Sequence, residues 1–197
     1  ISQNIEAQII RVPTGAQDYY PALYGGVGVV ELRVDGIERK AIGIDFAELE
    51  SRSVLAYTGV PRNSGINNWE VTKAYIDGDR QVQKNFVKIA EIASFMRRAV
   101  EGANWPEAGR LLREEWKNRR TNAPGISTPL IDDLVKKTQA AGALGAQVCG
   151  AGGGGCVYFL TDKESRARVA AVIEEAGATV LPVKVAPKGV QVKVEKD

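Results

Sequence analysis

The longest helical pattern of hydrophobic and polar positions runs from about residue 67 to residue 120. Apolar residues recur there in steps of three and four, which places them on one face of an α-helix. They are Val82, Phe86, Ile89, Ala93, Met96 and Val100. We predict that this stripe is buried in the core. A second helix is expected to start near Trp105, and its charged end, 113–120, reads as a solvated face.

Four shorter helical patterns lie outside this block. They cover residues 1–12, 17–26, about 128–142 and 163–176. Each ends at residues that stop a helix, namely Pro13, the pair Gly25-Gly26, Gly142 and Gly177.

Alternating apolar positions predict strands between these helices. The candidate strands are 27–34 and 37–44, joined by a hairpin turn at Asp35-Gly36, then 53–57, two strands around residues 150–155, and two closing strands at 180–185 and 190–194. The order of elements after residue 128 is α-β-β-α-β with a possible further strand. This order predicts an α+β fold with a ferredoxin-like layer.

The loop between two of these strands is unusually rich in glycine. It reads Cys149-Gly150-Ala151-Gly152-Gly153-Gly154-Gly155-Cys156. Such a backbone can adopt positive φ and approach another group closely. It lacks the Lys-Ser or Lys-Thr of a P-loop. It also leads into a strand rather than into the helix that a Rossmann dinucleotide-binding motif requires, so neither of these nucleotide-binding motifs fits. Two uses stay open: a cradle of N–H groups around an anion, or close packing against another element.

Composition narrows the chemistry. The 197 residues are 44% hydrophobic and 25% charged with a net charge of +2, so we expect no nucleic-acid or membrane partner and a cytoplasmic protein. The two cysteines favour free thiols over a disulfide. With no histidine in the chain, a catalytic base must be a carboxylate, Lys, Tyr or Cys, and no metal site is predicted.

Two polar residues are candidates for a site on their position alone. Asp18 falls at the start of the helix predicted over 17–26, where a carboxylate either caps the helix or stays ionised for chemistry. Arg62 follows the strand 53–57 in a polar loop, where it is either solvated or binds an anionic ligand.

Three segments resemble one family, the GHMP kinases (galactokinase, homoserine kinase, mevalonate kinase and phosphomevalonate kinase). The segment from Thr14 to Gly26 resembles the one that carries their catalytic aspartate, and Cys149 to Val157 resembles their C-terminal glycine motif. The segment from Tyr57 to Arg62 is similar to a strand end in the sugar-kinase branch, especially the heptose-phosphate kinases. The resemblance covers nearly the whole chain.

The resemblance implies both domains and residue roles. Residues 1–52 would be the end of an N-terminal domain, and 53–197 a ferredoxin-like C-terminal domain with inserted helices. Asp18 would accept or orient the proton of the substrate hydroxyl. The substrate would contact Gln17, Tyr19, Tyr20 and Arg62, and the phosphate would contact the loop of Gly150, Ala151, Gly152, Gly153, Gly154 and Gly155.

The implied activity is ATP-dependent phosphorylation of a hydroxyl of a sugar or sugar phosphate. The family's nucleotide loop should precede Asp18 by more than the seventeen residues present, so we expect the later part of a kinase, inactive by itself. ATP and Mg²⁺ would then bind mainly to the missing segment, which would be a partner beside the small-molecule substrate. A mevalonate-type kinase, a diphosphate decarboxylase of the same superfamily and a non-catalytic substrate-binding fragment stay open.

Overall fold

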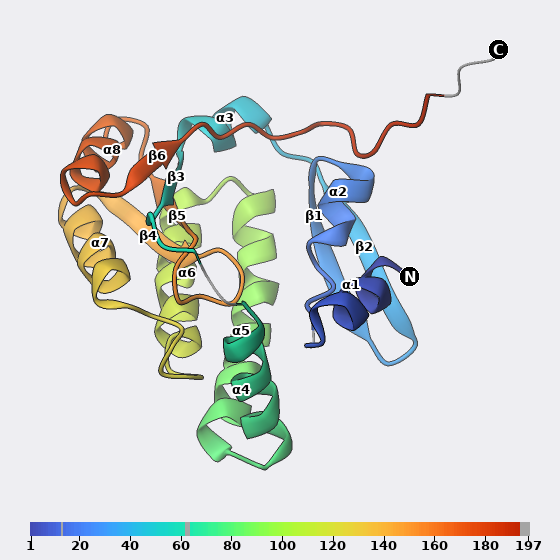
Figure 1. The fold of residues 1–197 in the computed structure, drawn as a ribbon. Helices are drawn as coiled ribbons and strands as arrows, with labels where there is room; N and C mark the ends of the chain where they lie inside the picture. Colours follow the sequence, from blue (N-terminus) through green and yellow to red (C-terminus); the bar gives the residue numbers. More distant parts are fainter. Residues whose placement is uncertain (13, 62–63, 194–197) are drawn as a thin grey trace.

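The computed structural model describes residues 1–12, 14–61 and 64–193 (Figure 1). The helices are α1 (Ser2–Ile10), α2 (Tyr19–Tyr24), α3 (Phe46–Ser51), α4 (Ser64–Ile76), α5 (Arg80–Glu101), α6 (Trp105–Arg119), α7 (Pro129–Ala140) and α8 (Arg166–Glu175). The strands are β1 (Val27–Arg33), β2 (Gly36–Ile42), β3 (Ser53–Tyr57), β4 (Ala143–Val148), β5 (Cys156–Thr161) and β6 (Thr179–Leu181). Within these ranges, no helix has both the length and the apolar character needed to cross a lipid bilayer.

The larger sheet has four antiparallel strands in the order β4-β5-β3-β6. In chain order, β3 is followed by the helices α4 to α7, then by β4, β5, α8 and β6. This is the split β-α-β-β-α-β arrangement, in which the first and third strands are central. The predicted α+β fold with a ferredoxin-like layer and inserted helices is therefore confirmed.

Helices cover both faces of this sheet. Ile131 and Leu134 of α7 and Val169 of α8 pack with the fully buried Phe159 on one face. On the other face, residues of helices α5 and α6, among them Leu111, form a second cluster with Leu160 of β5. Burying a large apolar side chain contributes about 1.5–3 kcal/mol, so these two layers hold the helical block against the sheet.

The hairpin forms as predicted and lies beside the helical block (Figure 1). Strands β1 and β2 pair in antiparallel register from Val27↔Ile42 to Arg33↔Gly36. Helix α2 precedes the hairpin and ends at Gly25, whose φ of 68° is the left-handed value that favours glycine. Helix α1 buries none of its side chains, although its isoleucines have helical spacing.

The closing strands were overpredicted. Only Thr179–Leu181 pairs with β3, and no strand lies within the described residues 190–193. The chain after β6 instead runs across the molecule to α2 (Figure 1). There the Gly26 N–H donates to the Ala186 carbonyl at 2.7 Å and the Val190 N–H donates to the Ala22 carbonyl at 3.0 Å. An alternating segment becomes a strand only where its backbone pairs with another strand, and the backbone of this segment bonds to α2 and Gly26 instead.

The predicted stripe of α5 is only partly buried. The buried residues of the helix are Val82, Asn85, Ile92 and Ala99, whereas Ala93 and Phe86, which is 42% exposed, are not. Helix α5 therefore has two faces with apolar residues. One packs in the core, and the other faces the cleft described next.

Candidate active site

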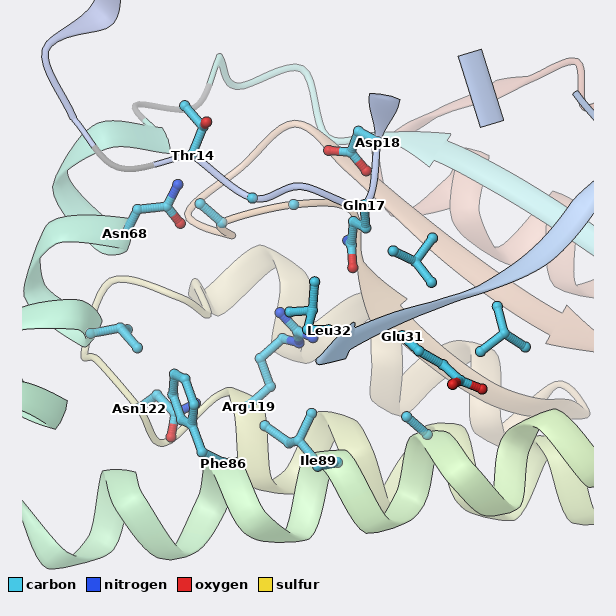
Figure 2. A pocket seen from close by; sticks show the side chains of 18 of the residues that line it. Thr14, Gln17, Asp18, Glu31, Leu32, Asn68, Phe86, Ile89, Arg119 and Asn122 are labelled. Carbon is cyan, nitrogen blue, oxygen red and sulfur yellow. The ribbon is translucent and has the colours of Figure 1, made fainter. Parts of the chain in front are cut away.

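A cleft of about 1460 Å³ lies between the hairpin side of the molecule and the helices α4 and α5 (Figure 2). Its lining includes Thr14, Gln17, Asp18 and Tyr19, Glu31 and Leu32 of β1, Asn68 of α4, Phe86, Ile89 and Arg97 of α5, Arg119 and Asn122 at the end of α6, and Gly150 and Ala151. Segments far apart in the sequence thus meet around one space.

Asp18 lines this cleft and is the residue immediately before α2. Its backbone is helical, with φ of −71°, and its side chain makes no capping hydrogen bond. The residue is exposed, and Figure 2 shows its carboxylate in the cleft, with Gln17 nearby in the chain. The capping role that the sequence left open is therefore not the one observed, and the carboxylate is accessible to a ligand.

The other predicted substrate contacts do not all gather here. Tyr19 lines the cleft and donates its hydroxyl to the Glu6 carboxylate, and this contact raises the pKa of Tyr19 above its ordinary value. Tyr20 instead stacks on Tyr24, with ring centroids 6.2 Å apart, and does not line the cleft. Arg62 lies outside the described residues.

The glycine loop divides into two parts. Gly150 and Ala151 line the cleft. The second part packs against other loops: the Gly153 N–H donates to the Ile126 carbonyl and the Gly155 N–H to the Val60 carbonyl, both at 2.9 Å. Gly152 has φ of 79°, and a Cβ there would collide with the Ile126 backbone. Close packing therefore accounts for the second half of the loop, and Gly150 and Ala151 of the first half face the cleft.

Asn67 of α4 fastens this loop and was missed in the sequence. It is 7% exposed, and its Nδ2 donates to the carbonyls of Gly125 and Ala151, each at 3.0 Å. Its partners are 58 and 84 positions away along the chain, so no local pattern marks the residue. These hydrogen bonds fix the position of the glycine loop at the edge of the cleft.

An ion-pair network joins the hairpin to α5 across the cleft. Glu31 of β1 accepts from Arg33, Lys40 and Arg97, the last at 3.1 Å. Hydrogen bonds from Arg33 and then Lys40 hold the pKa of the Glu31 carboxyl below its usual value. Since exposed ion pairs contribute little to stability, this network orients β1 and α5 more than it stabilises them.

The described residues offer no set of metal ligands. No three side chains of His, Cys, Asp or Glu are grouped there in a way that could hold a metal ion. For ATP, the loop leaves only its Gly150-Ala151 edge toward the cleft, since two of its other N–H groups already bind protein carbonyls. The donor set therefore fits a contact to a phosphate and not a complete nucleotide or Mg²⁺ site.

The fold and the glycine loop together define an α+β domain with a ligand cleft at its edge. Residues 96–179 match the family model described as "GHMP kinases C terminal". Over this part of the chain, the match agrees with the resemblance to the GHMP kinases that the motifs indicated.

Two curated relatives show where the similarity extends. Mevalonate kinase of Thermococcus sibiricus is 42% identical over 72 residues, which is 36% of this chain and 21% of the relative. D-glycero-alpha-D-manno-heptose 7-phosphate kinase of Campylobacter jejuni is 26% identical over 166 residues, which is 82% of this chain and 48% of the relative. The chain spans less than half the length of both.

A solved structure supports the same fold. The crystal structure of L. major mevalonate kinase in complex with R-mevalonate superposes with a TM-score of 0.74 at 19% sequence identity. The match covers 90% of this chain and 55% of that protein. At this identity the likeness concerns the fold alone.

Proposed function

We propose that the chain is part of an ATP-dependent kinase that phosphorylates a hydroxyl group of a sugar or sugar phosphate. The observation that carries this proposal is the cleft itself, where the accessible carboxylate of Asp18 and the Gly150-Ala151 edge of the glycine loop line one space. A phosphoryl acceptor bound there would contact both groups.

In this proposal, Asp18 accepts or orients the proton of the attacking hydroxyl. Phosphoryl transfer depends mainly on positioning and on stabilising charge, so a fixed carboxylate and backbone N–H groups suit it without a histidine. The helix α2, anchored by the returning C-terminal segment, holds Asp18 in position. Gln17 and Tyr19 lie in the same cleft and are proposed to contact the substrate. The same role is proposed for Arg62.

ATP supplies the phosphoryl group when bound, with Mg²⁺ as its expected companion. We assign their main binding determinants to a segment that precedes Asp18 in the kinase. The division into residues 1–52 of the first domain and 53–197 of the second belongs to this proposal.

The extent of similarity favours a sugar phosphate. The alignment with the heptose 7-phosphate kinase covers 82% of the chain, whereas the alignment with the mevalonate kinase covers 36%. The higher identity of the shorter alignment, 42%, supports a mevalonate-type alcohol as the second candidate. The two remaining alternatives, a diphosphate decarboxylase and a binding fragment without turnover, are distinguished by the activity assay described next.

The test begins with the intact mass of the protein as it is made, under denaturing conditions. ADP release is then measured on that protein with sugars, sugar phosphates and mevalonate. Asp18→Asn should lower turnover about 100-fold or more while the fold is retained. Asp35→Asn in the hairpin turn is the matched control. Near-normal turnover by the Asp18 variant would contradict the assignment, and carbon dioxide release would indicate the decarboxylase.

A further inference from the structure

Two hydrogen-bond donors at the end of α6 line the cleft and have no role in the function proposed so far. Arg119 is the last residue of α6, and Asn122 follows in the turn, where its N–H donates to the Arg119 carbonyl at 3.0 Å. Figure 2 shows Arg119 extending from α6 into the cleft. The sequence had predicted a solvated face for this charged segment.

Arg119 is fixed by a buried carboxylate. Its Nε and Nη2 both contact Oε1 of Glu115 at 2.6 Å. The Glu115 side chain is 10% exposed and the Arg119 side chain 32%. The contacts use one edge of the guanidinium, and its Nη1 donors have no partner among the residues that the structure describes. The free edge is therefore held in place before any ligand binds.

Asn122 is fixed in the same way, by a buried amide. Asn85 of α5 is 2% exposed, and its Nδ2 donates to Oδ1 of Asn122 at 2.8 Å. The orientation of Asn85 is set in turn, because its own Oδ1 accepts from Gln81. Since an amide has one acceptor oxygen and one donor nitrogen, Asn122 has its Nδ2 donors left for the cleft.

We propose that Arg119 and Asn122 bind the phosphate of a phosphorylated sugar, which makes the phosphoryl acceptor a sugar phosphate rather than a neutral sugar. The proposal rests on the proposed kinase function and names its substrate class. A guanidinium edge and an amide N–H₂ both donate, and phosphate offers several acceptor oxygens with negative charge. Because Glu115 and Asn85 already order both donors, binding costs little side-chain entropy.

The surroundings fit the rest of such a ligand. Phe86 and Ile89 of α5 line the same cleft and provide an apolar wall. A few fixed polar groups against an apolar wall are typical of small-molecule sites. Gly150 and Ala151 lie on the same cleft, so a sugar phosphate bound at Arg119 stays within the space shared with Asp18.

The first experiment measures binding to this chain without turnover. Mannose 6-phosphate and mannose are titrated separately, followed by calorimetry and by the NMR signals of the Arg119 Nε–H and the Asn122 amide. Mannose 6-phosphate should bind and shift both signals, and mannose should shift neither. Arg119→Gln should weaken binding about tenfold or more. Arg110→Gln on the exposed side of α6, where Arg110 pairs with Glu107 and Glu114, is the control and should bind normally.

A second variant guards against misfolding of the first, because Arg119→Gln leaves Glu115 without its ion partner. Asn122→Asp keeps the oxygen that accepts from Asn85 but places a carboxylate where the phosphate would bind, so binding should be lost in a folded protein. If both folded variants bind mannose 6-phosphate as the parent does, the subsite is wrong.

Turnover separates this proposal from the kinase assignment. In the protein as it is made, Arg119→Gln should raise KM for the sugar phosphate far more than it lowers kcat. An unchanged KM in an active kinase would overturn the subsite alone. Binding that depends on Arg119 in a protein that never releases ADP would uphold the subsite and overturn the kinase function.

Discussion

At the scale of single residues, Glu115 combines a buried carboxyl group with a single cationic partner. Burial raises the pKa of Glu115, and the contact with Arg119 only partly opposes this. Its Oε2 is buried and has no hydrogen-bond partner within the described part of the chain. The buried charge of Glu115 therefore lowers the stability of the fold, and it orients the guanidinium of Arg119.

We expect this carboxyl group to give a measurable pH dependence. Above the ordinary value of 4.5 the unfolded chain has lost the proton that the folded protein still holds, so the free energy of unfolding contributed by Glu115 falls as pH rises from there to its folded pKa. Glu115→Gln should therefore gain stability relative to the parent as pH rises through this window. Urea unfolding from pH 4 to 7 tests this, with the exposed Glu175→Gln as control. A constant difference between Glu115→Gln and the parent would contradict it.

Gly152 gives a second prediction at this scale. A Cβ at this position would lie 2.9 Å from the Ile126 Cα, and the backbone has φ of 79°. Gly152→Ala should cost about 2–4 kcal/mol, since strain and a collision with backbone add. Gly177→Ala is the matched control: φ is 87°, but no atom lies within 4 Å of the added Cβ, so only about 1 kcal/mol is expected. Equal losses in urea unfolding would show that packing does not require Gly152.

At the scale of elements, α4 holds the glycine loop through one amide. Asn67→Ala should leave the carbonyls of Gly125 and Ala151 without a donor, at a cost of about 1–3 kcal/mol. Amide hydrogen exchange over residues 150–155 should become faster. Lys73→Ala, which removes a surface ion pair of the same helix, is the control. Unchanged exchange in the loop would mean that its own packing is sufficient.

The elements themselves were largely predictable, because their signals are local. Caps and glycines bound the helices, as at Thr128, whose Oγ1 accepts from the Ile131 N–H at 3.2 Å. What failed depended on distant partners. Within the described part of the strand predicted at 190–194, Val190 bonds to α2 instead of to another strand, and the burial of α5 was decided by which of its faces meets the core.

The candidate site was predictable only where its composition is unusual or its sequence resembles a known family. The glycine loop was found through its composition, whereas the Asp18 segment was found through its resemblance to the GHMP kinases, and both border the cleft. Arg119 and Asn67 were not, since an arginine in a charged helix end and an amide in a helix look like surface residues. Only the fold shows that the buried Glu115 holds Arg119 toward the cleft and that Asn67 is itself buried against the glycine loop.

At the scale of the whole molecule, the C-terminal segment joins the sheet to the hairpin side. Gly189 passes so close to α2 that a Cβ would lie 2.5 Å from the Tyr24 nitrogen and closer still to the Leu23 carbonyl. Gly189→Ala should detach this segment and speed amide exchange at Gly26 and Val190, with the four-stranded sheet intact. Gly43→Ala, where no atom lies within 4 Å of the new Cβ, is the control. Retained protection at Gly26 would show that α2 is anchored by other contacts.

This returning segment also sets the order in which a nascent chain can be completed. The helix beside Asp18 is synthesised before the residues that hold it, Ala186 and Val190. Domains fold as units during synthesis, so the sheet can close once β6 has emerged. A message truncated just after β6 would therefore yield a folded sheet that carries an unanchored Asp18.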